Sequence, residues 1–439
     1  MPDILDPPAF MARQPLPGHQ LLSMLASALD GPAYVYDLAE VRRNCQALQQ
    51  ALPSGSEIFY SLKANPHPVL LSELRSIGVK AEVCSGGELA AALHAGWLGL
   101  DLLYTGPGKR DRDVAQALCA GVVEFSVDSP AGLQQIDRLA AEQDTAARCL
   151  LRVNDDQPVP GQGLTMTGVS SQFGADVGWI RAQPDRFAGS ARVPVTGLHL
   201  YMGTNLTTVA DLLRQFERAL RTARELADLL GQHGARIDTF DLGGGFGAPF
   251  AKEGCRIDFA QLRRPLSQLV EEILGSGNRI CYESGRYLVG TAGALITRVL
   301  DVKPSQGTQV VVLESGINHL GGMSGLRRLP PLSPQLLTRS AESPDGSSPP
   351  GGPAEPTMVC GPLCTPLDVW ARAQPLGRVE IGDALLVPNV GAYGLSASLA
   401  LFLGHELPAE MVIDSDLHGS AVVSSSRLSL HRSPTVTAP

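Results

Sequence analysis

The chain has 439 residues, of which 44% are hydrophobic and 18% charged, and its formal net charge is −9. This length exceeds one ordinary core, so we expect two or three domains, or one large α/β barrel with a smaller partner domain. The hydrophobic content excludes wholesale disorder. The acidic balance argues against nucleic acid or an anionic membrane as the main partner.

The eight cysteines are scattered, and none forms a Cys-x-x-Cys pair. A disulfide scaffold or a structural zinc site is therefore not expected, and the sequence predicts no metal. Residues 1–20 lack the apolar segment of a secretory signal. The uncharged run 384–404 contains Pro388 and Gly391, so we interpret it as strand, turn and helix and expect no membrane span. A cytoplasmic protein is expected.

Residues 31–290 alternate short apolar runs with longer amphipathic stretches. The run 33–36 is strand-like, and the clearest helix is expected over 211–230, where apolar residues recur at helical spacing. Repeated strand–helix units predict parallel strands joined by right-handed crossovers. The expected fold class is α/β, with a (β/α)8 barrel as the favoured closure.

Beyond residue 290 the pattern changes to β-rich runs, which predicts a separate C-terminal β domain over 291–423. Within it, 329–356 is dense in Pro, Ser and Gly and is expected to be a flexible loop. Residues 424–439 are expected to form a frayed tail, and 1–30 an N-terminal segment outside the barrel.

Lys63 ends an apolar run and precedes Asn65-Pro66. A surface lysine after a strand is the ordinary interpretation. In parallel barrels, however, chemistry collects on the loops that follow the strands. Burial at a barrel mouth would lower the pKa of Lys63, so that its amine attacks a carbonyl cofactor.

Three consecutive glycines, Gly243, Gly244 and Gly245, follow another expected strand in DLGGGFG. Without Cβ atoms, their backbone N–H groups can converge on an anion. The motif matches neither a dinucleotide fingerprint nor a Walker A loop. A tight turn and a cup for a phosphate monoester remain equally good interpretations of this motif alone.

Glu283 and Arg286 lie in ESGR, at the end of a further expected strand. The two side chains could simply pair with each other. In the functional interpretation Glu283 keeps a pyridinium nitrogen protonated, while Arg286 and the Gly285 amide bind a phosphate.

Two motifs of the β domain add candidates. Cys364 lies between prolines and near Asp368, and is either an inert thiol or one presented to a pocket. Tyr393 lies on a glycine-flanked turn. It is either a structural residue or one whose hydroxyl donates a hydrogen bond to a phosphate. Together the motifs predict a site for a carbonyl-bearing phosphate cofactor, with a lysine to hold it and an acid to protonate it.

Nine motifs occur in one order: YSLKANP, EVCSGGEL, TGPGK, LRVN, GLHLYMGTN, DLGGGFG, ESGR, GPLCTPLD and GAYG. Over 31–408, apart from the 329–356 loop, this set resembles the fold-type III pyridoxal-phosphate decarboxylases, which include diaminopimelate, ornithine and arginine decarboxylases. The resemblance implies an alanine-racemase-like barrel and a β domain on which the segment 1–30 packs. It also implies a head-to-tail homodimer with active sites at the interface.

The resemblance implies specific roles. Lys63 would bind pyridoxal 5'-phosphate covalently, Glu283 would pair with its ring nitrogen, and Cys364 of the second chain would protonate the carbon that loses CO₂. The residues implied to bind the cofactor are Lys63, Glu82, Arg152, Tyr201, Thr204, Gly243, Gly244, Gly245, Glu283, Gly285, Arg286 and Tyr393. The residues implied to contact the substrate are Thr365, Asp368 and Tyr393.

Two positions depart from the family pattern. Tyr201 stands where a histidine usually stacks on the cofactor ring, and Thr365 follows Cys364 where diaminopimelate decarboxylases have a glutamate that grips the distal ammonium. The pattern is similar to a branch that decarboxylates glutamate tethered to an acyl-carrier protein, as in butirosin biosynthesis. Alternatives are a diaminopimelate or other free amino-acid decarboxylase, a racemase, and a catalytically silent binding homologue.

Overall fold

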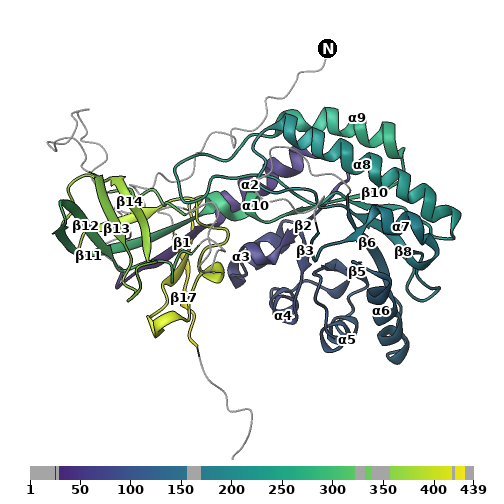
Figure 1. Cartoon of the computed structure of the whole chain (residues 1–439), viewed down its shortest axis with the longest axis horizontal. Coiled ribbons are helices and arrows are strands. Elements are labelled where there is room, and N and C mark those ends of the chain that lie inside the picture. The colour runs from purple at the N-terminus through teal and green to yellow at the C-terminus, as the bar shows by residue number, and fades with distance from the viewer. Residues whose placement is uncertain are drawn as a thin grey trace, which may run out of the picture.

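A computed structural model describes residue 25 and residues 29–155, 170–321, 332–338, 356–417 and 421–430. The described chain has two lobes, a barrel surrounded by helices and a smaller lobe of strands (Figure 1). No helix within these ranges has the length and hydropathy to cross a membrane.

The first lobe is a closed ring of eight parallel strands, in which each strand pairs with the next along the chain and the last returns to the first. The ring consists of β2 (Glu57–Ser61), β3 (Lys80–Val83), β4 (Leu102–Tyr104), β5 (Glu124–Val127), β6 (Arg148–Asn154), β8 (Val195–His199), β9 (Thr239–Asp241) and β10 (Arg279–Ser284). A short strand, β7 (Ala175–Asp176), pairs only with β6. The predicted (β/α)8 barrel is confirmed.

Helices connect the strands on the outside of the ring. They are α2 (Leu38–Ala51), α3 (Pro68–Ser76), α4 (Gly86–His94), α5 (Asp111–Cys119), α6 (Pro130–Glu142), α7 (Val177–Ala182), α8 (Val209–Gln232), α9 (Arg263–Leu274) and α10 (Arg286–Val289). Helix α8 begins where the Thr208 side chain accepts the Asp211 N–H, and it buries Phe216, Leu220 and Leu226 against the barrel. The helix predicted over 211–230 is thus present and slightly longer.

The inside of the ring explains why polar groups gather at its mouth. Phe59, Leu103, Leu150 and Cys281 form a buried cluster of their own, separate from the large core under the helices. Alternate residues of a strand share one face. Two positions after Leu150 and Cys281 come Arg152 of β6 and Glu283 of β10. These two side chains therefore face inward too, one layer nearer the carboxyl ends of the strands.

The second lobe is a mixed sheet in the order β14-β13-β12-β11-β1-β16-β17, with β15 also paired to β11. Its strands are β1 (Ala33–Asp37), β11 (Gly293–Ser305), β12 (Thr308–Leu313), β13 (Pro356–Cys360), β14 (Val369–Pro375), β15 (Ala384–Val387), β16 (Ala409–Asp414) and β17 (Ala421–Arg427). The expected C-terminal β-rich domain is therefore present, and its bounds 291–423 stay a prediction. Strand β1, which the sequence analysis placed inside 31–290, lies instead between β11 and β16.

Three boundary segments differ from expectation. Residues 332–338 belong to the loop expected to be flexible, yet Leu336 is buried and Leu337 exchanges two backbone hydrogen bonds with Leu386 of β15. Strand β17 pairs with β16, so the expected tail begins later than residue 424. Of the segment 1–30, Leu25 packs in a cluster with Val35 and other residues of the second sheet. The rest of 1–28, most of 329–356 and residues 431–439 lie outside the described ranges.

Candidate active site

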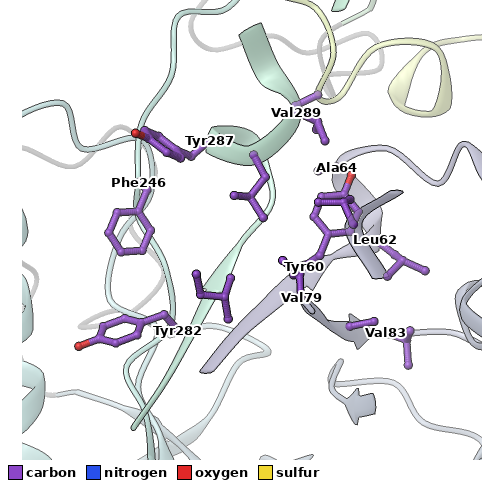
Figure 2. Packing of buried hydrophobic residues seen from close by; sticks show 14 of the residues in the cluster. Tyr60, Leu62, Ala64, Val79, Val83, Phe246, Tyr282, Tyr287 and Val289 are labelled. Atoms are coloured by element: carbon purple, nitrogen blue, oxygen red, sulfur yellow. The ribbon is translucent and has the colours of Figure 1, made fainter. Parts of the chain in front are cut away.

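Lys63 lies on a single 3-10 turn, Leu62–Ala64, directly after β2. Its neighbours Leu62 and Ala64 are buried in the large core together with Tyr60, Val79 and Val289 (Figure 2). The Lys63 side chain is instead 45% exposed at the barrel mouth. The core therefore fixes the backbone on both sides of the lysine while the amine faces the opening.

Glu82 of β3 is the partner of this amine. Lys63 Nζ lies 3.3 Å from each Glu82 carboxylate oxygen, and the Thr105 hydroxyl donates to Oε1 at 2.6 Å. Partial loss of solvent around the amine would lower the pKa of Lys63, but the charges of Glu82 and Glu283 hold it well above its ordinary value. The sequence analysis expects burial to lower the pKa of Lys63. In this structure the pKa is raised, so that expectation is wrong.

Glu283 lies on the floor of the mouth, on the inward face of β10. Its Oε1 lies 3.3 Å from His199 Nε2, and both side chains are almost fully buried. Neither atom has a hydrogen-bond partner among the described residues. Burial, with the charges of Glu82 and Asp241, raises the pKa of Glu283 well above its ordinary value.

Two further side chains complete this floor. The Ser126 hydroxyl lies 2.8 Å from His199 Nδ1, and burial lowers the pKa of His199 well below its ordinary value. Asp241 accepts the Gly243 N–H at 2.8 Å, and burial raises its pKa to about 7. Donor atoms of His199, Asp241 and Glu283 lie within 4.8 Å of one another, a spacing that one metal ion could share. The sequence predicts no metal, and that stays a prediction.

The three glycines form a cradle beside this floor, because neighbouring groups approach their backbone closely. A Cβ on Gly244 would lie 2.2 Å from the Glu283 carbonyl oxygen, and one on Gly243 would lie 2.8 Å from the Tyr201 ring. Gly243 and Gly245 also have positive φ values of 65° and 101°. Glycine is therefore required at these positions, because neighbouring groups pack directly against the backbone and two of the three have positive φ.

Gly244→Ala is accordingly expected to destabilise the protein by about 1–3 kcal/mol, because the new methyl group meets rigid backbone. Gly231→Ala is the matched control: it lies in α8 with no atom within 4 Å of the added Cβ. We expect this control to leave stability unchanged or raise it by up to about 1 kcal/mol. Urea unfolding of both variants measures the difference, and equal midpoints would contradict the close approach.

Arg286 lies at the start of α10, next to the cradle. Its guanidinium carbon lies 4.7 Å from the centre of the Tyr393 ring and 5.4 Å from that of Phe250, and its Nε has no hydrogen-bond partner in the described structure. Within the described ranges Glu283 and Arg286 form no ion pair, so the simple pairing considered from the sequence is wrong. The two charges face different parts of the site.

The second lobe closes one side of the mouth through the Tyr393 turn. The Tyr393 backbone N–H donates to the Ala64 carbonyl at 2.7 Å, and Asn65 donates to the Gly391 carbonyl at 2.9 Å. Tyr393 itself has a positive φ of 55°. These bonds fix the turn directly onto the Lys63 loop.

The Cys364 loop follows β13, and Cys364 is exposed, with no hydrogen bond or ion pair to another described residue. Asp368 is buried, and its carboxylate accepts the Ile317 and Leu363 N–H groups, each at 2.8 Å. The Thr365 hydroxyl accepts the Leu367 N–H at 3.3 Å. Asp368 thus braces the loop that presents Cys364, and the substrate contacts implied for Thr365 and Asp368 stay predictions.

The barrel mouth also contains Lys109, to which the motifs assign no role, and Arg152, which the resemblance implies to bind the cofactor. Lys109 donates to the Gly106 carbonyl at 2.5 Å, and burial lowers its pKa to about 8. It lines a cavity of about 630 Å³ between the loop after β4 and helix α6. Arg152 lies on the inward face of β6, and its guanidinium carbon lies 4.5 Å from the centre of the Phe173 ring. The inward-facing positions of β5 and β8 are the signal that would have identified Ser126 and His199.

These residues fit pyridoxal phosphate. The Lys63 amine suits an aldehyde, the buried Glu283 carboxylate suits a ring nitrogen, and the peptide groups of the three glycines with the Arg286 guanidinium suit a phosphate. Fold and site together define an enzyme of the pyridoxal-phosphate type on an alanine-racemase-like barrel.

Comparison with known families agrees. The model described as "Pyridoxal-dependent decarboxylase, pyridoxal binding domain" matches residues 38–290, more than half of the chain. The chain belongs to this family of pyridoxal-phosphate-dependent decarboxylases.

Similar proteins cover almost the whole chain. L-glutamyl-[BtrI acyl-carrier protein] decarboxylase of Niallia circulans is 28% identical over 394 residues, which are 89% of this chain and 90% of that protein. Diaminopimelate decarboxylase of Pseudomonas aeruginosa is 30% identical over 379 residues, 86% of each chain. The crystal structure of diaminopimelate decarboxylase from Helicobacter pylori with L-lysine has a TM-score of 0.77 at 24% identity, covering 89% of this chain and 94% of that one, and shows the shared fold.

Proposed function

We propose that this decarboxylase removes the α-carboxylate of a glutamate-like amino acid that is tethered through its side chain to an acyl-carrier protein. The observation that carries the proposal is the neutral Thr365 after Cys364, whose hydroxyl already accepts a backbone N–H. Compared with a glutamate at this position, Thr365 offers a distal ammonium no carboxylate, and the lost charge-assisted hydrogen bond is worth roughly 1.5–3 kcal/mol. A neutral amide or thioester at the far end of the substrate loses nothing. The name of the Niallia circulans relative supports the same substrate class.

The cofactor roles are part of the proposal. Pyridoxal phosphate supplies an electron-accepting ring when it is bound. Lys63 would hold its aldehyde, Glu283 would accept a hydrogen bond from its ring nitrogen, and the Tyr201 ring, which packs on Gly243, would contact it. The residues proposed to complete its pocket are Glu82, Arg152, Thr204, Gly243, Gly244, Gly245, Gly285, Arg286 and Tyr393.

The proton that replaces the lost carboxylate comes, we propose, from Cys364 of a second copy of the chain. Cys364 is exposed and has no bonded partner within its own described chain. It lies on the second lobe, whereas Lys63 lies on the barrel. A head-to-tail homodimer would bring a thiol of one subunit to the amine of the other.

The cavity beside Lys109 offers a path for the tether. It opens at the carboxyl ends of β4 and β5, the same end of the barrel as Lys63, and its polar lining includes Lys109, Gln134, Gln135, Arg138, Asp111 and Asp128. The two glutamine amides suit a polar arm that carries amides, whereas Arg138 is already paired with Asp111 at 2.6 Å.

Carbon dioxide release tests the proposal directly. The panel consists of a glutamyl-loaded acyl-carrier protein together with free diaminopimelate, lysine, ornithine, arginine and glutamate. We expect turnover of the carrier-bound substrate and little turnover of any free amino acid. Robust turnover of diaminopimelate would overturn the proposal in favour of the second candidate, a diaminopimelate decarboxylase, which is the activity named for the Pseudomonas aeruginosa relative.

Cys364→Ala is expected to keep the cofactor and to slow product formation by roughly 10²-fold or more, because the positioned proton donor is lost. Cys255→Ala, another exposed cysteine, is the matched control and should behave like the wild type. Initial rates, together with the stereochemistry of deuterium incorporated from D₂O, measure the effect. An unchanged rate with unchanged stereochemistry would remove Cys364 from the mechanism.

A further inference from the structure

We propose that Ser126 and His199 act together as positioning residues for Glu283. The Ser126 hydroxyl fixes the tautomer of His199, so that His199 Nε2–H donates to Glu283 Oε1. The second oxygen of Glu283 is then left for the ring nitrogen of the cofactor. This inference rests on the role proposed above for Glu283.

The three side chains come from three different strands of the barrel, β5, β8 and β10, and form one buried row. Ser126 Oγ lies 2.8 Å from His199 Nδ1, and His199 Nε2 lies 3.3 Å from Glu283 Oε1. All three are at most 3% exposed. Each nitrogen of the imidazole therefore faces one polar group; the Ser126 contact is a hydrogen bond, whereas the His199–Glu283 contact is close but lies outside hydrogen-bond geometry in this structure.

Chemistry then selects one tautomer. Burial and the nearby charge of Arg152 keep His199 neutral, so only one of its nitrogens carries a hydrogen. A carboxylate can only accept, whereas a serine hydroxyl can donate or accept. With Glu283 ionised, the hydrogen lies on Nε2 and Ser126 donates to Nδ1. The other tautomer would require a protonated Glu283, which would lose its charge-assisted bond to the ring nitrogen.

The surrounding charges explain why such a donor is needed. Glu82 and Asp241 both raise the pKa of Glu283, whereas Lys63 and Arg152 lower it. One oxygen of Asp241 accepts the Gly243 N–H and the other is unpartnered in the described structure, so no described contact directs an Asp241 hydrogen toward Glu283. An N–H group from His199 stabilises the ionised form of Glu283 without adding a charge to the floor.

The test compares His199→Leu, His199→Gln and Ser126→Ala. Affinity for added pyridoxal phosphate and the pH dependence of the bound cofactor's visible absorption are measured on each. We expect His199→Leu to weaken cofactor binding by about 10- to 100-fold and to move the pH profile. His199→Gln should stay within about threefold of the wild type, since its amide still donates. Ser126→Ala, which adds no volume, should fall between the two.

Ser315 provides a matched control, because its hydroxyl lies 3.1 Å from His319 Nδ1 in an equivalent buried pair of the second lobe. Ser315→Ala should leave cofactor affinity and pH profile unchanged. If His199→Leu and Ser126→Ala both bind the cofactor like the wild type, the inference is overturned. The same holds if His199→Gln binds as weakly as His199→Leu while both fold. A wild-type protein that takes up no cofactor would instead overturn the proposed function.

Discussion

Lys63→Ala is expected to abolish the visible absorption of bound pyridoxal phosphate and to reduce decarboxylation by roughly a thousandfold or more. Lys63 lies on a short turn whose two flanking residues are buried in the core. We expect its amine to be the one that binds the cofactor aldehyde. The fold should survive, because Glu82 keeps its hydrogen bond from Thr105. Absorption spectra and CO₂ release measure the two losses.

Lys80→Ala is the matched control for this variant. Lys80 pairs with Glu57 at 3.0 Å at the start of β3, and so lies toward the amino ends of the strands. This control should retain both cofactor and activity. If Lys63→Ala kept the absorption band and the rate while Lys80→Ala lost them, the site would have been placed at the wrong end of the barrel.

Glu283→Gln is expected to have opposite effects on activity and stability. Activity should fall by about 10²-fold or more, since the charge that holds the ring nitrogen is lost. The cofactor-free protein should become more stable, on the order of 1–3 kcal/mol, because a buried carboxylate beside Glu82 and Asp241 is removed.

The sign of the pH dependence follows from the raised pKa of Glu283. The folded state holds this proton more tightly than the unfolded state, so the wild type loses stability as pH rises above the ordinary glutamate pKa. Glutamine does not titrate, and the advantage of Glu283→Gln should therefore grow as pH rises. Urea unfolding of cofactor-free proteins at acidic and neutral pH measures it. A variant less stable than the wild type at neutral pH would contradict this account.

Most of the architecture could be predicted from the sequence, because the alternation of apolar runs with helical stripes is periodic over the whole barrel. The predictions are wrong where the local hydrophobic pattern does not determine which strand a given strand pairs with. Strand β1 is a short apolar run like those of the barrel, yet it pairs with β11 and β16 of the second sheet. Strand β17 contains three consecutive serines, mostly exposed, which gave no apolar signal.

The site divides in the same way. Lys63, the three glycines and Glu283 could be proposed because each is an unusual residue directly after an apolar run. Ser126 and His199 are 73 residues apart and meet only when the ring of strands closes, so no motif joins them. The pKa of Lys63 was predicted in the wrong direction because its partner Glu82 comes from the neighbouring strand.

The most direct test is to incubate the protein with pyridoxal phosphate, reduce the mixture with borohydride and locate the modified peptide by mass spectrometry. Our account predicts a single phosphopyridoxyl group on Lys63, with no labelling of Lys80 or Lys109. Labelling confined to another lysine, or no labelling of folded protein, would contradict it.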